Sequence, residues 1–576
     1  MKKRAVISFC VLIALFTGMI FRVLDLSQGE TLRQAAQNQS SYVMTLGKTR
    51  GTIYDCNLNP LTNAEEVSRA VAIATPESVT AISDTLAPKE SAAVFEELEK
   101  GKPVQFDWPT NATAAASGLL TYQVPQRYTK QSGLEHIIGY VGQDGHGVTG
   151  IEKSFDSWLS ECNGSVSLRY RADALGRALT GETMSLDDTT QNSKNGVVLT
   201  IDERIQQIAA QAAQNHFSSG AVVVLETGAA KIRAMVSLPD YDPNNLTAAL
   251  EDASSPLVNR TLNAYNTGSV FKLVVACAAA EQNETEMTLE CTGTTDYAGR
   301  LFQCIGGTPH GTVDISRAVA FSCNCFFIHL ADRIGYQPIL SMAQKLGFGR
   351  ATWLAADFSS ATGSLPTARN LSAPAALANF SFGQGDLLAT PLQIAGMVQA
   401  IACDGVYTEP SLVEGRLSAG ATVAAAAAEV SSRAMTSHTA ELVRSYMVAA
   451  IEGGTASSGK PETGGAGAKT ATAETGSTDA NGEEVIQAWC AGFYPAEQPK
   501  YVIVVMAENG KSGSKVCAPV FKEVADGIAQ LEACLLYTSA AFQVEPYNQY
   551  QNILNVPKKE LTAENHGVCT LRLTTM

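Results

Sequence analysis

The chain has 576 residues, of which 45% are hydrophobic and 17% are charged, and its formal net charge at pH 7 is −15. This composition excludes a disordered chain and leaves room for one large domain with smaller ones beside it. The acidic balance argues against a nucleic-acid-binding surface, because phosphate recognition needs clustered positive charge.

The first 22 residues have the pattern of a membrane anchor. Three basic residues at positions 2–4 precede an apolar run that contains no charge before Arg22, a length sufficient to cross a bilayer. No small-x-small cleavage site follows the run, so we expect an uncleaved single-pass anchor over residues 1–22 rather than a signal peptide. The positively charged flank predicts that the N-terminus is cytoplasmic and that the anchor lies in the cell membrane. The rest of the chain is then extracytoplasmic.

The sequence pattern of residues 23–190 predicts a juxtamembrane segment followed by a small α+β domain. A Gln-rich helical stretch follows the anchor, and "GKTRGTIYDCNLNPLTN" then has a strand-and-turn pattern. Short strands alternate with helices from position 64 to about 145. The segment "GVTGIEKSFDSWLS" predicts an amphipathic helix that closes this part, and "SLDDTTQNSKNG" predicts a polar linker rich in turn residues.

Residues 196–532 predict one α/β domain. A strand and a helix are expected in "VVLTIDERIQQIAAQAAQNHF", and two strands joined at Thr227 and Gly228 in "SSGAVVVLETGAAKIRAMVSLP". Residues 256–460 are expected to be mostly helical. The last strands are expected in "GAGAKTATAET", "IQAWCAGFYP" and "KYVIVVMAENG", before the helix "PVFKEVADGIAQLEAC". Helices enclosed by an early hairpin and late strands predict a sheet assembled from distant parts of the chain.

The stretch "LNAYNTGSVFKLVVACAAA" places Ser269 and Lys272 three residues apart at the start of an apolar helix. A serine at a helix start is commonly only an N-cap. Residues i and i+3 share a helical face, however, so the Lys272 amine is expected near the Ser269 hydroxyl. Burial lowers the pKa of a lysine, and such a lysine can act as the base that makes a serine nucleophilic. Backbone N–H groups at the helix start can stabilise an oxyanion.

The S-x-x-K pattern alone is weak evidence, because it recurs at Ser457–Lys460 and Ser512–Lys515 in Gly/Ser-rich segments typical of solvated loops. Two further patterns follow Ser269 in order. Ser322-Cys323-Asn324 lies between two helical segments, where an ordinary polar turn is the alternative, and Lys469-Thr470-Ala471-Thr472 lies on an expected strand. The three patterns together are typical of the penicillin-recognising acyltransferases.

The sequence resembles the class B penicillin-binding proteins, the membrane-anchored peptidoglycan D,D-transpeptidases of division, elongation and sporulation. The resemblance covers roughly residues 50–531 and includes, in family order, "RGTIYDCNLNPLT", "GVTGIEKSFDSWL", "LPDYDPN", "GTVDISRAVAFSCN" and "SFGQGDLLATPLQIA". It implies a penicillin-binding transpeptidase domain related to serine β-lactamases, with a helical core and an antiparallel sheet. A membrane helix and an α+β pedestal of the dimerisation type would precede this domain.

The resemblance also implies roles for the residues of the three patterns. Ser269 would be the acylated nucleophile and Lys272 the base that takes its proton. Ser322 would relay a proton between the two lysines and the leaving amine, and Asn324 would hydrogen-bond the substrate. The strand residues Lys469, Thr470, Ala471 and Thr472 would bind the terminal carboxylate of the donor peptide. The backbone N–H groups of Ser269 and Thr472 would form the oxyanion hole.

The reaction implied is acyl transfer without a metal or cofactor. Ser269 would attack the D-Ala–D-Ala bond and release D-alanine, and an amine of a neighbouring stem peptide would then take the acyl group. Stem peptides with their lipid-linked precursor, β-lactams and a polytopic membrane glycosyltransferase are the implied partners, with no nucleic acid. A serine β-lactamase and a catalytically idle penicillin-binding scaffold or sensor are the alternatives. No E-x-x-L-N segment, which would supply a lactamase's deacylation base, occurs between Asn324 and Lys469.

Four positions depart from the family pattern. Thr267 replaces a common proline before the Gly-Ser pair, and Ala471 replaces the glycine of K-T-G, which adds a methyl group beside the active-site helix. In the first pedestal block, Cys56 stands in place of an arginine and Leu58 in place of a glycine. These pedestal changes bear on local structure rather than on chemistry.

The cysteines and the C-terminus yield two further expectations. Of 13 cysteines, Cys291 and Cys304 flank a short Gly-rich loop and could form a disulfide, and no C-x-x-C pair occurs, so no zinc site is expected. The segment "CLLYTS" at 534–539 is what TGT-CTC-TTA-TAC-ACA-TCT, a sequence resembling a transposon end, would encode. Residues 533–576 are therefore interpreted as an artefactual join, with a natural variable tail as the alternative.

Overall fold

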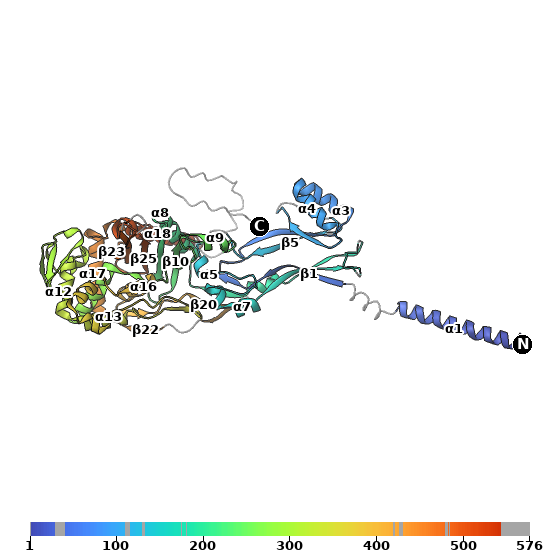
Figure 1. Ribbon diagram of the computed structural model, residues 1–576, viewed down its shortest axis with the longest axis horizontal. Helices are drawn as coiled ribbons and strands as arrows, with labels where there is room; N and C mark the ends of the chain where they lie inside the picture. The colour runs from blue at the N-terminus through green and yellow to red at the C-terminus, as the bar shows by residue number, and fades with distance from the viewer. Residues whose placement is uncertain are drawn as a thin grey trace, which may run out of the picture. The chain divides into compact units, whose positions relative to one another are not determined.

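The computed structural model describes residues 2–28, 41–109, 116–129, 133–173, 175–179, 181–418, 421–425, 430–478, 482 and 484–542 (Figure 1). The chain splits into two units, residues 1–528 and 529–576. Of the second unit the structure describes only the end of helix α18 (Ala518–Phe542), so most of the tail of disputed origin lies outside the described residues.

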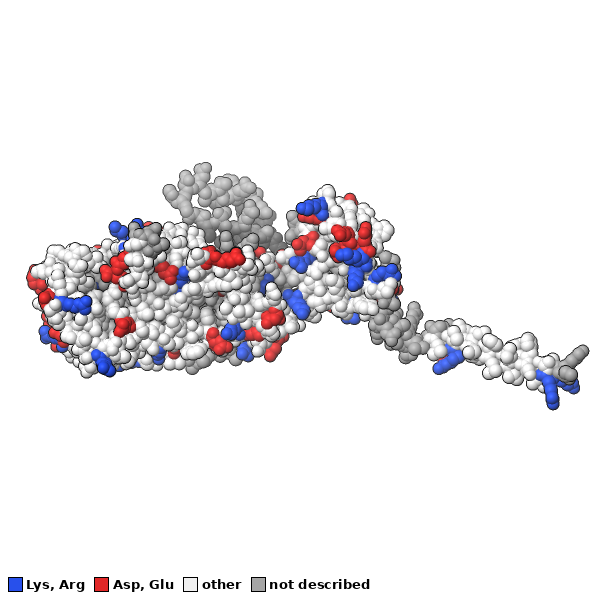
Figure 2. Space-filling model, viewed as in Figure 1, with Lys and Arg blue, Asp and Glu red and all other residues white. Residues whose placement is uncertain are grey.

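Helix α1 (Lys2–Gln28) is the one helix in the described part of the chain that is long and apolar enough to cross a membrane. Its apolar stretch runs from Lys3 to Leu26, and basic side chains lie near both of its ends (Figure 2). Large apolar side chains along it are exposed, as expected for a surface that faces lipid. The helix expected directly after it falls in 29–40, outside the described residues.

The pedestal contains two antiparallel three-stranded sheets and several short helices. One sheet has the order β1 (Ser41–Thr49), β6 (Gly164–Arg171), β7 (Ser185–Asp188), and the other the order β4 (Val104–Asp107), β3 (Glu65–Ala72), β5 (Leu119–Gln126). The helices are α3 (Pro76–Thr85), α4 (Pro88–Leu98), α5 (Glu135–Ile138), α6 (Gly150–Ser154) and α7 (Asp156–Glu161). The small core of Ala70, Ile82, Val94, Leu98 and Trp108 joins α3 and α4 to the second sheet.

Two expectations for this region were wrong in detail. The polar segment taken for a linker forms β7, which pairs with β6, and the 3₁₀ helix η1 (Thr190–Lys194), which begins where Asp188 Oδ1 accepts hydrogen bonds from the N–H and hydroxyl groups of Thr190 at 2.8 and 2.6 Å. The expected closing helix is two short helices, α6 and α7. Leu58, at a position the family gives to glycine, has a left-handed φ of 65°, which costs a non-glycine residue about 1 kcal/mol.

A four-stranded sheet connects the pedestal to the rest of the chain. Its order is β2 (Thr52–Tyr54), β8 (Gly196–Leu199), β20 (Val413–Ser418), β21 (Ala421–Ala425), with β2 parallel to β8. The first pedestal block therefore pairs with the strand that begins the expected second domain.

A buried ion-pair network includes Arg50, two residues before β2. The Glu152 carboxylate has no exposed surface and accepts hydrogen bonds from Arg50 at 2.8 Å, Arg127 at 2.7 Å and the Tyr128 hydroxyl at 3.0 Å. These residues come from the two pedestal blocks identified in the sequence and from the end of β5. The network thus holds three separate segments together.

We expect Glu152→Gln to destabilise the protein by about 3–5 kcal/mol, because the Arg127 guanidinium loses its counter-charge and Arg50 keeps only its pair with Asp156. Urea unfolding of the detergent-solubilised protein, followed by circular dichroism, measures this effect. The matched control is Asp187→Asn, which breaks an exposed 2.8 Å pair with Arg169 and should cost less than about 1 kcal/mol. Equal effects of the two substitutions would contradict a structural role for the network.

The larger domain is built on a five-stranded antiparallel sheet in the order β10, β9, β25, β24, β23. Its strands are β9 (Gly220–Glu226), β10 (Ile232–Leu238), β23 (Gly467–Thr478), β24 (Glu484–Tyr494) and β25 (Tyr501–Glu508). Helices α8 (Glu203–His216) and α18 lie on one side of the sheet and α16 (Pro391–Ala402) on the other (Figure 1). The expected hairpin, its bend near Thr227 and the three late strands are confirmed, and β23 is an edge strand.

The remaining elements form a helical lobe beside the sheet. Its helices are α9 (Leu246–Glu251), η2 (Gly268–Phe271), α10 (Lys272–Glu281), η3 (Ile305–Gly307), α11 (Ile315–Ala320), α12 (Asn324–Ile334), α13 (Tyr336–Lys345), α14 (Ala368–Leu371), α15 (Pro374–Ser381), α17 (Ser437–Gly453), η4 (Ser457–Gly459) and η5 (Gly513–Cys517). Short strand pairs interrupt them: β11 (Tyr265–Asn266) with β18 (Leu388–Ala389), β12 (Leu289–Cys291) with β15 (Gly311–Val313), β13 (Thr294–Tyr297) with β14 (Arg300–Gln303), β16 (Trp353–Ala355) with β17 (Phe358–Ser359), and β19 (Val406–Thr408) with β22 (Ser431–Arg433).

Helix α10 is central to this lobe. Every residue from Lys272 to Ala279 is buried, which explains why the helix has no polar face in the sequence. A fully buried helix is a rigid support for whatever its N-terminus carries.

Candidate active site

Ser269 lies on the 3₁₀ turn η2 that leads into α10, and its side chain is at the surface edge of the core, 8% exposed. The turn is held from two sides. The Gly268 N–H donates to the carbonyl of Gly383 at 3.0 Å, and the Trp489 indole donates to the carbonyl of Asn266 at 2.9 Å. The "SFGQG" loop and strand β24 therefore fix the backbone on which Ser269 stands.

Gly268 is required where it stands for two reasons. Its φ is +52°, and a Cβ added there would lie 2.9 Å from the Cβ of Ala473 and 3.4 Å from that of Ala471 on β23. The serine turn and the edge strand thus approach each other as closely as a glycine permits.

We expect Gly268→Ala to slow acylation of Ser269 by a penicillin about 10- to 100-fold, because the turn must move away from β23. The control is Gly228→Ala, where φ is +78° but no atom lies within 4 Å of an added Cβ. That variant has the same backbone strain and should react within about twofold of the wild-type rate. Adduct formation with a fluorescent penicillin measures both rates, and equal slowing of both variants would contradict the close approach.

Lys272 is fully buried on the first turn of α10, and its amine contacts the S-x-N turn. Nζ lies 2.7 Å from the Ser322 carbonyl oxygen, 3.2 Å from Ser322 Oγ and 2.6 Å from Asn324 Oδ1. Among the described residues no hydrogen bond joins this amine to Ser269, so the expected direct pairing is replaced by pairing with the S-x-N turn. Burial lowers the pKa of Lys272 to about 7, and nearby cysteines raise it by a smaller amount.

Ser322 occupies the turn between α11 and α12, as the sequence predicts, with a left-handed φ of 60°. Its Oγ also lies 3.0 Å from the Lys469 Nζ, so one hydroxyl lies between two buried amines. A hydroxyl has one donor and two acceptor positions, so it can donate to one amine and accept from the other. The Asn324 amide donates to the Gln303 carbonyl at 2.9 Å, which orients its oxygen toward Lys272.

Strand β23 brings the third pattern to the same place. Lys469 is fully buried, and burial together with the Lys272 charge holds its pKa well below the usual range. Thr470 Oγ1 donates to Thr455 Oγ1 at 2.9 Å, and Thr472 Oγ1 accepts from the Gly513 N–H at 3.3 Å. Thr455 was not identified from the sequence, because it belongs to none of the three patterns.

The two lysines have no carboxylate partner among the described residues, although each is fully buried. A buried cation without a counter-charge is costly, so the arrangement favours neutral amines that can accept a proton. The nearby edge of β23 carries backbone N–H groups that no neighbouring strand pairs, and such groups can bind an anion. The candidate nucleophile therefore lies on the η2 turn and the candidate base on α10, in contact with the start of α12. The N–H groups that could bind an anion lie on the edge of β23.

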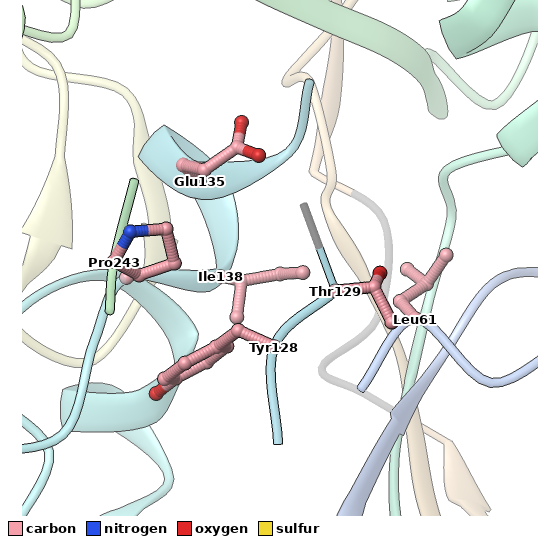
Figure 3. Close-up of a pocket in the computed structure, with 7 residues that line it drawn as sticks. Leu61, Tyr128, Thr129, Glu135, Ile138 and Pro243 are labelled. Atoms are coloured by element: carbon pink, nitrogen blue, oxygen red, sulfur yellow. The ribbon is translucent and has the colours of Figure 1, made fainter. Parts of the chain in front are cut away.

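A small internal cavity lies elsewhere, between pedestal residues and Pro243 (Figure 3). Its volume is about 10 Å³, room for at most about one water molecule, and none of the residues of the three patterns lines it. It is not a substrate site. On the face drawn in Figure 2, acidic and basic side chains are interspersed.

Comparison with known proteins gives concordant results. The profile of the penicillin binding protein transpeptidase domain matches residues 220–526, more than half of the chain. Peptidoglycan D,D-transpeptidase PbpA of Mycolicibacterium smegmatis is 32% identical over 435 residues, which are 70% of this chain and 82% of that protein. Probable peptidoglycan D,D-transpeptidase PenA of Neisseria meningitidis serogroup A is 27% identical over 562 residues, 89% of this chain and 90% of that protein.

Solved structures show the same fold. Penicillin-binding protein A of M. tuberculosis, solved as a penicillin G acyl-enzyme complex, superposes with a TM-score of 0.61 at 24% identity. The superposition covers 84% of this chain and 100% of that one. The fold expected from the sequence, a helical core with an antiparallel sheet after an α+β region, is confirmed.

Proposed function

Since the chain belongs to the penicillin-binding protein transpeptidase family, as a class B member, we propose that Ser269 is the nucleophile of its peptidoglycan D,D-transpeptidase reaction. The enzyme is a serine-type acyltransferase that cross-links stem peptides and is inhibited by β-lactams. The roles of the residues are assigned from one observation. The amines of two buried lysines, Lys272 and Lys469, both contact the hydroxyl of Ser322. This arrangement stands beside the turn that presents Ser269.

In the first half-reaction, Ser269 Oγ attacks the carbonyl carbon of the D-Ala–D-Ala bond, and its proton passes to the Lys272 amine. The oxyanion that forms is bound by the backbone N–H groups of Ser269 and Thr472. The C–N bond then breaks, and the departing D-alanine amine takes a proton through Ser322. The acyl group remains as an ester on Ser269.

In the second half-reaction, an amine of a neighbouring stem peptide attacks the ester and restores the free serine. Lys469, Thr470 and Thr472, with the backbone of Ala471, hold the donor's terminal carboxylate during acylation. Asn324 hydrogen-bonds the donor peptide while its oxygen remains in contact with Lys272. The Ala471 methyl group faces the Gly268 turn, where it would lie 3.4 Å from a Cβ added to Gly268.

Acylation is expected to accelerate as the pH rises through about 7, since Lys272 can take the Ser269 proton only when it is neutral and its pKa is about 7. Below that pH the amine is protonated and the rate falls about tenfold per pH unit, to about one hundredth of its maximum at pH 5. Stopped-flow acylation with a chromogenic cephalosporin measures the profile, and circular dichroism at each pH checks the fold. A flat profile from pH 5 to 9 would contradict Lys272 as the base.

The chain division and membrane placement that we propose follow the sequence. Residues 1–22 anchor the protein, 23–190 form the pedestal, and 196–532 form the transpeptidase domain. The basic residues at 2–4 support a cytoplasmic N-terminus and a catalytic domain outside the membrane, which protease treatment of spheroplasts tests. A catalytic domain that is protected in intact spheroplasts and cleaved only after they are lysed would overturn this orientation.

A polytopic membrane glycosyltransferase is the partner that we propose for the anchor and the pedestal. The enzyme consumes glycan strands, and the family profile accounts for one catalytic domain, the acyltransferase. The exposed apolar side chains of Tyr42 and Val43 on β1, close in sequence to the anchor, support a protein contact there. Co-purification of the partner with the wild-type chain, but not with a Val43→Asp variant, tests this contact.

A cross-linking assay tests the function as a whole. The full-length enzyme in detergent is incubated with uncrosslinked glycan strands, and the muropeptides are separated after muramidase digestion. Cross-linked dimers that disappear when penicillin is added support the transpeptidase. Release of D-alanine without dimers would make the chain a carboxypeptidase, and consumption of penicillin with neither product would make it a β-lactamase.

A further inference from the structure

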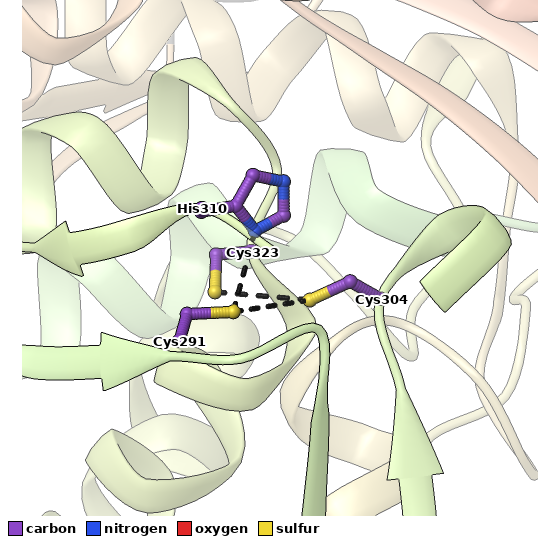
Figure 4. A group of neighbouring side chains, drawn as sticks. All are labelled: Cys291, Cys304, His310 and Cys323. Atoms are coloured by element: carbon purple, nitrogen blue, oxygen red, sulfur yellow. Dashed lines mark hydrogen bonds between the residues drawn. The ribbon is translucent and has the colours of Figure 1, made fainter. Parts of the chain in front are cut away.

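A second cluster of reactive side chains lies beside the S-x-N turn. The sulfurs of Cys291, Cys304 and Cys323 and the Nδ1 of His310 point toward one another (Figure 4). All four atoms lie within 4.8 Å of one another. The three cysteines are buried, with at most 2% of their surface exposed, and none is in a disulfide.

The separations of these atoms match one coordination geometry. Cys304 Sγ lies 3.8 Å from both Cys291 Sγ and Cys323 Sγ, and Cys291 Sγ lies 3.4 Å from His310 Nδ1. A tetrahedral zinc ion with Zn–S bonds of about 2.3 Å and a Zn–N bond of about 2.0 Å separates its sulfurs by about 3.8 Å and its sulfur and nitrogen by about 3.5 Å. The disulfide that Cys291 and Cys304 could have formed is absent, since its sulfurs would lie about 2.0 Å apart.

We propose that Cys291, Cys304, His310 and Cys323 bind one Zn²⁺ ion. Three sulfurs and one imidazole nitrogen are a ligand set typical of structural zinc sites, which are closed and tetrahedral. Binding displaces the thiol protons, and the resulting thiolates accept hydrogen bonds from their surroundings. One such donor is in place: the Phe326 N–H lies 3.5 Å from Cys323 Sγ at the start of α12.

Besides the cysteine cluster, hydrogen bonds of Thr295 with His329 and of Tyr297 with Asp332 join the segment that carries three of the ligands to α12. Residues 289–313 form two-stranded pairs of three or four residues, and Leu301 and Ile305 are 72% and 63% exposed. Strand pairs this short are marginal without a hydrophobic face or a cross-link. A zinc ion supplies the cross-link, joining the end of β12, the residue after β14 and the residue before β15 to the start of α12.

The sequence expectation of no zinc site rested on the missing C-x-x-C pair. That pair places two ligands on one tight turn, whereas here each ligand comes from a separate segment. The four positions become neighbours only when β12 pairs with β15 and the S-x-N turn packs beneath them.

If the proposed function is right, the zinc ion also affects catalysis, because one of its ligands is in the S-x-N turn. Cys323 stands between Ser322, whose hydroxyl contacts both lysines, and Asn324, whose oxygen contacts Lys272. A zinc–sulfur bond at the middle residue fixes the turn on which both neighbours depend. Zinc is therefore a positioning element for the S-x-N turn and takes no part in the acyl transfer itself.

The metal content of the full-length protein, purified in detergent without chelators, tests the site. We expect about one zinc ion per chain by inductively coupled plasma mass spectrometry, and loss of at least about nine tenths of it in Cys304→Ser and in His310→Ala. The matched control is Cys325→Ser, because Cys325 Sγ lies 3.6 Å from Cys304 Sγ but is outside the four-atom group. A wild-type chain with no zinc, with iron in its place, or with zinc that both ligand variants retain overturns the proposal.

A spectroscopic measurement keeps the test valid if a ligand variant fails to fold. Wild-type protein is stripped with a chelator under reducing conditions and refilled with Co²⁺ alone. Tetrahedral thiolate coordination gives intense absorption in the near ultraviolet and visible d–d bands, and their absence overturns the site.

The rate of penicillin adduct formation tests separately whether the zinc ion positions the S-x-N turn. We expect the stripped protein to form its penicillin adduct at least about tenfold more slowly and to recover when Zn²⁺ is added. An unchanged rate overturns the positioning role. A zinc-loaded protein that forms no adduct at all leaves the metal site standing and instead contradicts the proposed function.

Discussion

Ser269→Ala is expected to abolish the covalent penicillin adduct, with acylation slowed by at least about 10⁴-fold relative to the wild-type protein. Ser322 is not expected to take its place, because its hydroxyl lies between the two buried amines and is not on the turn that carries Ser269. The substitution removes one oxygen at an 8% exposed position, so the fold should be retained. Intact mass after incubation with penicillin measures the adduct directly.

The control for this variant is a second serine in an S-x-x-K pattern. Ser457 and Lys460 have the same spacing, but Ser457 lies on η4 and Lys460 pairs with Glu452 at 2.6 Å. Ser457→Ala should therefore acylate at the wild-type rate. An adduct that persists in Ser269→Ala, mapped by peptide digestion to another residue, would show that the nucleophile is misassigned.

Lys272→Met is expected to slow acylation about 10³-fold, since the base is lost while the length and apolar character of the side chain are kept. The remaining activity should no longer vary with pH between 6 and 8, because the group whose pKa is about 7 has been removed. Stopped-flow acylation at several pH values measures both effects. Thermal unfolding separates this result from loss of fold.

The comparison variant is Lys460→Met, which removes a half-exposed amine from the other S-x-x-K pattern. It should acylate within about twofold of the wild-type rate, because an exposed ion pair contributes little. Acylation by Lys272→Met within tenfold of the wild-type rate would assign the base to another group, and Lys469 would be the first to test.

The sequence predicted the parts of this molecule that depend on local pattern. The run "AVVVLE" and the Thr227-Gly228 bend identify the first hairpin, because a strand buried on both faces is continuously apolar. The apolar helix after Ser269 and the order of the three patterns predicted the site. The structure brings Lys272, Ser322, Asn324 and Lys469 into direct contact, while the roles assigned to them remain proposals.

Other features depend on contacts between distant segments and could not be predicted locally. The Lys272 amine pairs with the S-x-N turn some 50 residues away rather than with Ser269, because α11 and α12 pack against α10. The polar segment before residue 196 forms β7 because β6 is there to pair with it. The cysteines gather at one point only in the folded lobe.

At Leu58 the residue type gives a wrong indication of the backbone conformation, because leucine rarely adopts a positive φ. The left-handed φ at this position is set by the turn that Asp55 closes, accepting hydrogen bonds from the N–H groups of Asn57 and Asn59 at 2.8 and 2.7 Å. The family's glycine fits that backbone without strain, whereas leucine adopts it at a cost that these hydrogen bonds offset.

The fate of the acyl-enzyme distinguishes a transpeptidase from a β-lactamase and from an idle scaffold. The full-length protein is mixed with penicillin, and the intact mass of the chain and the remaining penicillin are followed over several hours. We expect one adduct per chain, mapped to Ser269 and stable while excess penicillin persists, since the sequence has no E-x-x-L-N segment between Asn324 and Lys469 to supply a deacylation base. Rapid loss of the adduct with consumption of the penicillin would instead identify a β-lactamase, and a chain that never gains mass would be a catalytically idle scaffold.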